Sequence, residues 1–173
     1  DAPLLTARRA AQAADDLNYQ PLAVRQKILQ TLEAAMLNQA QPYPASYELM
    51  SWEMVHAMAD NGITVGAHSE RHLILTLEDE ATSQREIEHS KQVLETRLQQ
   101  PVRHFAYPNG YFNARIQTMV AQAGFVSAVT TQRTIAHRGD HALALGRISL
   151  CEESTRGITG KYSEAVARLR LAT

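Results

Sequence analysis

The sequence is poor in cysteine, and neither sign of charge dominates it. Cys151 is the single cysteine among 173 residues, so a framework of disulfide bonds within the chain is excluded. The formal net charge of -1 provides no overall field that would attract nucleic acid or acidic lipid. These residues also contain no long apolar run and no internal repeat, which excludes a membrane-spanning helix and a repeat architecture within them.

The composition that remains is that of an ordinary globular domain. Hydrophobic residues make up 45% and charged residues 20%, and the length suffices for one domain with a real core. Pro21 suits a first helical turn, Ser51 suits an N-cap, and Asn61-Gly62 suits a helix end. With apolar residues at helical spacing, these signals predict helices over residues 5–18, 21–38, 51–61, 79–99, 113–122 and 161–171. Short strands are predicted over residues 63–67, 102–107, 125–130 and 143–150.

The order of these elements indicates the fold class. From residue 51 onward helices and strands alternate, which favours an α/β fold with a parallel sheet or barrel and helices outside it. The first 45 residues differ, because they contain two predicted helices and no clear strand. We therefore expect a helical segment over 1–45, an α/β domain over 46–173, and earlier strands that precede Asp1.

Two histidines follow the predicted strand 63–67. His68 stands directly after it and His72 four residues later, so a helical turn would bring both imidazoles to one side. In parallel α/β folds, ligands and catalytic groups gather at the carboxyl ends of strands, and imidazole is a common ligand of zinc and similar ions. The residues alone leave two interpretations open, a metal half-site or two unrelated histidines that are packed or exposed.

A turn and an arginine are the other candidates. In the segment 105–110, Pro108 fixes its own φ and Gly110 permits a tight turn, which could aim backbone N–H groups at an oxyanion. The same pattern also fits a plain connection between a strand and a helix. Arg147 lies in the predicted strand 143–150, where its charge needs a partner or must face water at an edge.

These features together resemble the polysaccharide deacetylases of the NodB-homology type, over roughly residues 48–150. His68-Ser-Glu-Arg-His72 is similar to the family's motif of a histidine, a serine or threonine, two variable residues and a second histidine. Phe105-Ala-Tyr-Pro-Asn-Gly110 resembles the next motif, and residues 123–130 resemble a later part. The resemblance implies a partial or distorted (β/α) barrel with fewer than eight strands, preceded by the helical segment.

The resemblance also implies a metal-dependent hydrolase that removes N-acetyl groups from a polysaccharide, leaving a free amine and acetate. The metal, most commonly zinc, would be held by two histidines and one aspartate, and a second aspartate would act as the base. The backbone N–H of Asn109 would help to bind the oxyanion. The implied site residues are His68 and His72 as metal ligands, Asn109, Tyr107 and Arg147 in catalysis, and Pro108 and Gly110 in substrate binding.

The chain departs from the family pattern in three places. Ala106 stands where many members have an arginine that orients the base, and Arg147 could take its place from a neighbouring strand. The late motif with a histidine has no counterpart near Arg147. The acidic pair that supplies the third ligand and the base is also missing, and in the family it precedes the part of the fold matched here. We therefore expect this chain to be the C-terminal part of a longer protein and to be inactive alone.

Two other functions stay open. The missing groups favour a catalytically inactive carbohydrate-binding or scaffolding module on the same fold, and a different amide substrate would keep both the fold and the metal. The expected partner is a polysaccharide rather than nucleic acid, and a second copy could cover an exposed sheet edge. The similarity to bacterial exopolysaccharide and envelope proteins implies an extracytoplasmic or envelope location.

Overall fold

The computed structural model describes residue 9 and residues 12–36, 49–149, 151, 153–157 and 159–172. The start of the helix predicted over 5–18 and the break predicted at 41–44 lie outside these residues. Residues 12–18 are helical. The remaining α-helices are α2 (Leu22–Met36), α3 (Trp52–Asp60), α4 (Glu80–Leu98), α5 (Ala114–Gln122) and α6 (Glu164–Ala172). Each of them agrees with a predicted helix to within about three residues at either end.

Local capping explains why these helices begin where they do. Ser51 precedes α3 and its side chain accepts a hydrogen bond from the Met54 N–H, while the Asn113 side chain accepts one from Ile116 at the start of α5. Asp79 caps α4 in the same way, accepting from the Thr82 N–H at 2.8 Å. After α3 the chain turns at Gly62, which has a φ of 85°. The predicted cap at Ser51 and the predicted helix end at Asn61-Gly62 are therefore confirmed.

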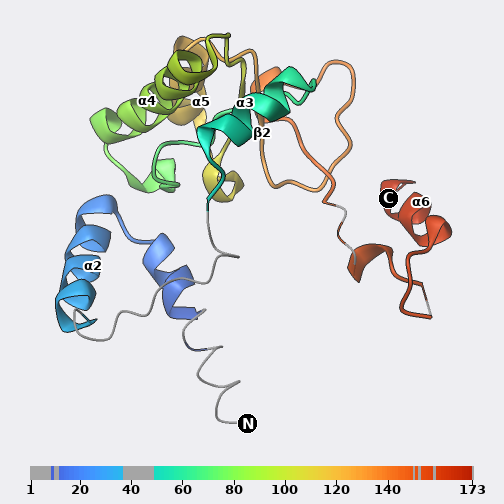
Figure 1. Cartoon of the computed structure of the whole chain (residues 1–173), viewed down its shortest axis with the longest axis horizontal. Coiled ribbons are helices and arrows are strands. Elements are labelled where there is room, and N and C mark those ends of the chain that lie inside the picture. Colours follow the sequence, from blue (N-terminus) through green and yellow to red (C-terminus); the bar gives the residue numbers. More distant parts are fainter. Residues whose placement is uncertain are drawn as a thin grey trace.

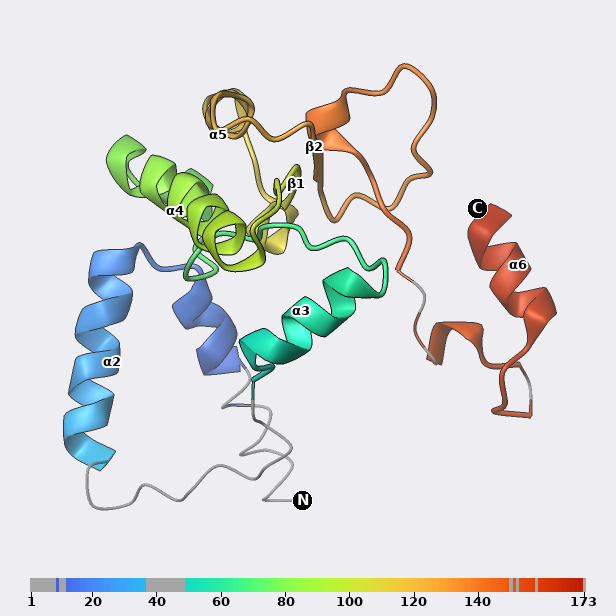
Figure 2. The ribbon, with the colours of Figure 1, turned by 45° about the horizontal axis from the view of Figure 1, so that its top comes forward.

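The sheet is small and parallel. Strand β1 (His104–Ala106) pairs with β2 (Ser127–Val129), with Phe105 opposite Ala128. Single bridging residues extend the sheet on both sides, Ala67 beside Phe105 and Leu145 beside Val129. Four neighbouring segments of the chain therefore run parallel to one another in this sheet. Figures 1 and 2 show that helices, not strands, make up most of the molecule.

The strands predicted over 63–67 and 143–150 were too long. Among the described residues, Ala67 and Leu145 are the positions of these segments that pair with the sheet. Residues 142–144 form a 3-10 turn, η4 (Ala142–Ala144), directly before Leu145, which pairs with β2. Leu150 lies outside the described residues. A strand ladder needs a hydrogen-bonded neighbour, which the residue pattern of a segment does not specify.

The two faces of the sheet differ. Ala67, Phe105 and Ala128 are buried and share one hydrophobic core with residues of α4 and α5, such as Ile87 and Ile116. Helices α4 and α5 contact each other, and in Figure 2 both lie to the left of β1. The alternate residues point the other way and line an open hollow of about 530 Å³, whose lining includes Thr64, Gly66, His68, His104, Ala106, Ser127 and Val129. Strand alternation thus sends one set of side chains to the core and leaves the other set accessible.

The first and last helices lie beside this core rather than within it. Leu22, the first residue of α2, donates its N–H to the Glu78 carboxylate at 2.8 Å, which ties the N-terminal helices to the domain. Helix α6 packs on the 3-10 turn η5 (Glu153–Thr155), and in both views these two elements lie away from the sheet. None of the helices among the described residues is both long and apolar enough to cross a membrane.

Candidate active site

His68 and His72 lie together at the carboxyl end of the sheet. Their ring centroids are 4.8 Å apart, with an interplanar angle of 80°. A helical turn does not produce this approach, so that part of the prediction was wrong. Instead, Ser69 and His72 adopt positive φ values of 62° and 55°, which fold the loop back on itself. This conformation costs non-glycine residues of order 1–3 kcal/mol, so the surrounding contacts must maintain it.

The position of the His68 ring is determined by the neighbouring strand. Its Nδ1 lies 2.7 Å from the carbonyl oxygen of Ala106, the last residue of β1. Since a carbonyl oxygen can only accept, Nδ1 carries the proton and donates it. In the neutral ring Nε2 then keeps its lone pair, which is the arrangement found in metal-binding histidines oriented by a backbone carbonyl.

The environment of His72 favours its neutral form. Burial lowers the pKa of this imidazole, and the nearby charges of His68 and Arg25 lower it further. A neutral imidazole is the form that binds a metal, since a protonated ring has no free lone pair. Both histidines therefore fit the role of metal ligands, although each of them is exposed at the surface.

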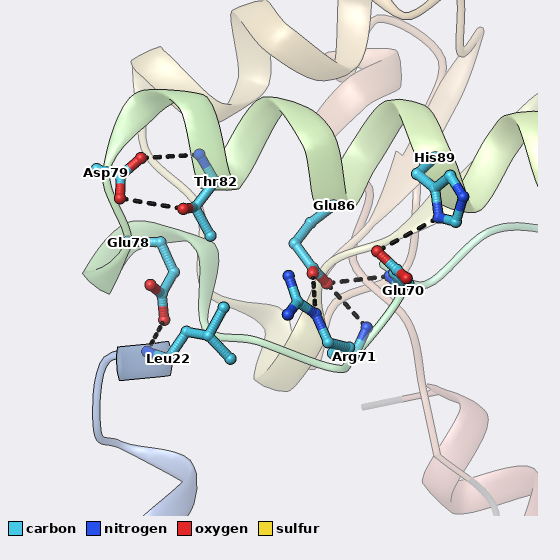
Figure 3. A network of polar contacts seen from close by, with 8 residues as sticks. All are labelled: Leu22, Glu70, Arg71, Glu78, Asp79, Thr82, Glu86 and His89. Atoms are coloured by element: carbon cyan, nitrogen blue, oxygen red, sulfur yellow. Dashed lines mark hydrogen bonds and ion pairs between the residues drawn. The ribbon is translucent and has the colours of Figure 1, made fainter. Parts of the chain in front are cut away.

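A buried glutamate on α4 supports the loop between the two histidines. Glu86 has no exposed surface, and one of its oxygens accepts hydrogen bonds from the N–H groups of Glu70 and Arg71, at 3.1 and 2.8 Å. Its other oxygen accepts from the Arg71 Nε at 2.7 Å. Figure 3 shows these bonds, together with an ion pair between Glu70 and His89 nearer the surface. Glu86 therefore holds the loop in its strained conformation.

Sequence reasoning did not identify Glu86 as part of the site. A signal for it was present, because Glu86 shares the buried face of α4 with Ser83, Ile87 and Ser90. A charged residue at a buried helical position requires a partner. The partners are backbone groups of a separate loop, which the helical pattern itself cannot reveal.

The turn after β1 forms the second part of the site. It is the 3-10 turn η3 (Pro108–Gly110). In it, the Gly110 N–H donates to the Tyr107 carbonyl at 2.8 Å and the Tyr111 N–H donates to the Pro108 carbonyl at 3.2 Å. Asn109 has a φ of 53°, and its carbonyl accepts a hydrogen bond from the Thr131 hydroxyl at 3.1 Å. The Asn109 N–H takes part in neither of these two bonds.

Gly110 is required in this turn for two separate reasons. Its φ is 77°, and a Cβ at this position would lie 2.1 Å from the Thr131 Oγ1 and 2.5 Å from the Thr131 nitrogen. We expect Gly110→Ala to lower the free energy of unfolding by about 3 kcal/mol, from backbone strain and overpacking together. The measurement is urea unfolding followed by circular dichroism.

Gly62→Ala is the matched control. Gly62 has a φ of 85° with nothing within 4 Å of an added Cβ, so this variant carries the strain without the clash. We expect it to cost about 1 kcal/mol. Equal losses in the two variants would contradict the steric role assigned to Thr131.

Tyr107 and Pro108 lie inside the protein. Tyr107 is fully buried, its hydroxyl donates to the Leu143 carbonyl at 2.9 Å, and burial raises its pKa to about 12. Its ring stacks on Phe112, with centroids 4.9 Å apart. Pro108 is buried beside it. The phenol therefore points into the core and keeps its proton, and Tyr107 supports the turn from behind.

Arg147 does not lie in a strand, contrary to the prediction. It follows the bridging residue Leu145 in an irregular segment, and its backbone N–H donates to Gln132 at 2.9 Å. At the preceding residue, Gly146, the segment around Thr134 lies very close to the backbone. A Cβ on Gly146 would lie only 1.9 Å from the Thr134 Oγ1. This contact replaces further strand pairing. The Arg147 side chain is exposed.

The described residues provide an incomplete metal site. Among residues 12–36, 49–149 and the shorter C-terminal ranges, no three or more His, Cys, Asp or Glu side chains are grouped so that they could hold a metal ion. His68 and His72 are a pair with the correct chemistry, and no described carboxylate joins them. Two buried atoms of the same loop, Ser69 Oγ and Arg71 Nη2, also find no hydrogen-bond partner in the described part of the chain.

Comparison with known protein families finds a match over most of this chain. The model of a family described as "Polysaccharide deacetylase" matches residues 8–128. YxkH of Bacillus subtilis, whose description assigns it to the polysaccharide deacetylases, is 26% identical over 114 residues, which are 66% of this chain and 41% of that protein. This chain therefore spans less than half the length of that relative.

Two solved structures are similar to this chain. The deacetylase PplD of Streptococcus pyogenes in complex with acetate is 25% identical, with a TM-score of 0.57, and the match covers 60% of this chain and 46% of PplD. IcaB from Ammonifex degensii is 22% identical with a TM-score of 0.56, and the match covers 67% of this chain and 54% of IcaB. The second likeness concerns the fold alone.

Proposed function

Because this chain belongs to the polysaccharide deacetylase family, we propose that the protein is a metal-dependent hydrolase that removes N-acetyl groups from an N-acetylated polysaccharide. The observation that carries the proposal is the pair of His68 and His72 at the carboxyl end of a parallel sheet, with their ring centroids 4.8 Å apart. The third metal ligand and the catalytic base are proposed to be carboxylates outside the described residues.

The same proposal extends to the architecture. Four adjacent parallel segments with α4 and α5 on one side and an open hollow on the other support a partial or distorted (β/α) barrel. Residues 1–45 would form a helical segment before the barrel part over 46–173. The edge at Ala67 would be covered by further strands of the protein or by a second copy.

Each site residue then has a stated task. His68 and His72 would hold a divalent ion, proposed to be zinc because imidazole nitrogens suit this metal. The ion would polarise the acetamide carbonyl and lower the pKa of a bound water. The Asn109 N–H would donate to the oxygen of that carbonyl as negative charge develops on it. Tyr107, Pro108 and Gly110 keep that N–H in position. Arg147, which is exposed, would orient the base.

The family and one relative support the proposed substrate class. PplD was solved in complex with acetate, and acetate is the acid that hydrolysis of an N-acetyl sugar would release. An N-acetylglucosamine-type polymer of the bacterial envelope or of an exopolysaccharide is the proposed substrate. A catalytically inactive carbohydrate-binding module is the second candidate, favoured by the lack of a third metal ligand among the described residues.

Product analysis separates the two candidates. We expect a longer protein that contains this chain and an upstream acidic pair to release acetate and a primary amine in equal amounts from tetra-N-acetylchitotetraose. A chelator should stop the release and zinc should restore it, whereas residues 1–173 alone should release little acetate. A longer protein that binds the tetrasaccharide but releases no acetate with zinc present would favour the binding module.

A further inference from the structure

Two tyrosines far apart in the sequence meet beside the candidate site. The hydroxyls of Tyr19 and Tyr111 are 3.4 Å apart, and their ring centroids are 6.2 Å apart at an angle of 64°. Tyr19 is 49% exposed and Tyr111 is 47% exposed. The pair therefore presents apolar ring surface and two phenol groups to solvent, which an isolated aromatic contact in a core would not do.

The position of Tyr111 connects the pair to the proposed chemistry. Tyr111 directly follows η3 and donates its N–H to Pro108 at 3.2 Å, so it is attached to the turn that contains Asn109. The next residue, Phe112, stacks on the buried Tyr107. The backbone that carries Tyr111 is thus anchored in the core while its ring stays at the surface.

Tyr19 is held in place by the helical segment. It lies at the end of the helical residues 12–18, three residues before the Leu22 N–H that Glu78 accepts at 2.8 Å. Arg25 follows one turn later along α2 and lies close enough to His72 for its charge to act on that ring. Residues 19–25 therefore pass from the turn at Tyr111 to the loop of His72.

An unsatisfied donor occurs in the same segment. Arg25 Nη1 is buried, and among the described residues no group accepts a hydrogen bond from it. A guanidinium N–H has no acceptor capacity, so an oxygen atom from elsewhere must satisfy it. Tyr19 and Arg25 thus place an exposed ring and a donor that is unsatisfied among the described residues on one short segment, beside the exposed ring of Tyr111. These groups are the elements of a ligand site.

We propose that Tyr19 and Tyr111 form an aromatic subsite for a sugar ring of the polysaccharide, adjacent to the unit whose acetamide reaches His68 and His72. The identity of the ligand rests on the function proposed above. The C–H groups of one face of a pyranose ring are apolar and pack on an aromatic ring, while the phenols hydrogen-bond to its hydroxyls. Arg25 would donate to an oxygen of the same or the next sugar.

The test is direct binding rather than activity. Isothermal titration calorimetry with tetra-N-acetylchitotetraose would be performed on the chain in a chelator, so that no metal contributes. We expect Tyr19→Ala and Tyr111→Ala each to weaken binding about tenfold, which corresponds to about 1.4 kcal/mol. Tyr111→Phe keeps the ring and should stay within about threefold of the original protein.

Tyr162→Ala is the matched control, because Tyr162 is 69% exposed and comes two residues before α6, a helix that Figure 2 shows away from the sheet. It should bind as the original protein does, and circular dichroism should show all variants folded. Alanine variants that bind within twofold of the original protein would overturn the subsite, as would an original protein without measurable binding at millimolar sugar.

These outcomes are separate from failure of the proposed function. Tyrosine-dependent binding without acetate release from the longer protein would retain the subsite and reject the hydrolase. Acetate release with sugar binding that is unaffected by either alanine replacement would retain the hydrolase and reject the subsite.

Discussion

Replacing Glu86 with alanine should lower the free energy of unfolding by about 3–5 kcal/mol, the cost usually found when one partner of a buried ion pair is removed. The carboxylate is fully buried and accepts three hydrogen bonds, two from the backbone of the loop and one from Arg71. Without it, the N–H groups of Glu70 and Arg71 lose their acceptor and the guanidinium loses its counter-charge. Urea unfolding followed by circular dichroism measures the change.

This replacement should also weaken metal binding, an effect that is separate from the loss of stability. Ser69 and His72 need the loop to be held at positive φ, and Glu86 is the side chain that holds it. We expect the longer protein with Glu86→Ala to bind zinc at least tenfold more weakly even at temperatures where it remains folded, since outer contacts of metal ligands typically contribute about 10–100-fold. Glu86→Gln keeps one oxygen acceptor, so its zinc affinity should lie between those of the original protein and of Glu86→Ala.

Glu88→Ala is the matched control on the same helix. Glu88 is exposed and accepts a hydrogen bond from Gln84 one turn earlier, at 2.8 Å. Its removal should change the free energy of unfolding by about 0.5 kcal/mol or less. If Glu86→Ala were as mild as Glu88→Ala, the buried network would not be what maintains the loop.

Replacing either histidine with alanine should nearly abolish hydrolysis. In the longer protein we expect His68→Ala and His72→Ala each to reduce kcat/KM by about 10³-fold or more, equivalent to about 4 kcal/mol of transition-state stabilisation. The physical reason is the loss of one of the ligands that hold the metal at the acetamide. The rate of acetate release and the zinc content of the purified variants are the two measurements.

Stability distinguishes this effect from misfolding. Both imidazoles are exposed, so the free energy of unfolding of these variants should stay within about 1 kcal/mol of that of the original protein. His137→Ala, at an exposed histidine in the loop after β2, is the control and should retain both zinc and activity. A His72→Ala variant that keeps its zinc and its rate would show that the pair is not the metal site.

The helices could be located from the sequence because their signals are local. The side chains of Ser51 and Asn113 each accept a hydrogen bond from the N–H three residues later and so cap their helices. The turn at Gly62 needs a positive φ, which glycine adopts freely. Strand lengths could not be predicted as well. The segments at Ala67 and Leu145 each join the sheet at a single pairing residue, which depends on neighbours that are distant in the sequence.

For the candidate site, the sequence by itself determined the residue types and their place after a strand: two histidines four residues apart, and a turn that requires Gly110. The tertiary structure decided how they are used. The His68 ring is oriented by the Ala106 carbonyl, and the loop is held by Glu86 from α4. Tyr19 meets Tyr111 across 92 positions of the chain. Local patterns determine helix starts and turns because the interacting groups are a few bonds apart, whereas these contacts exist only once the chain has folded.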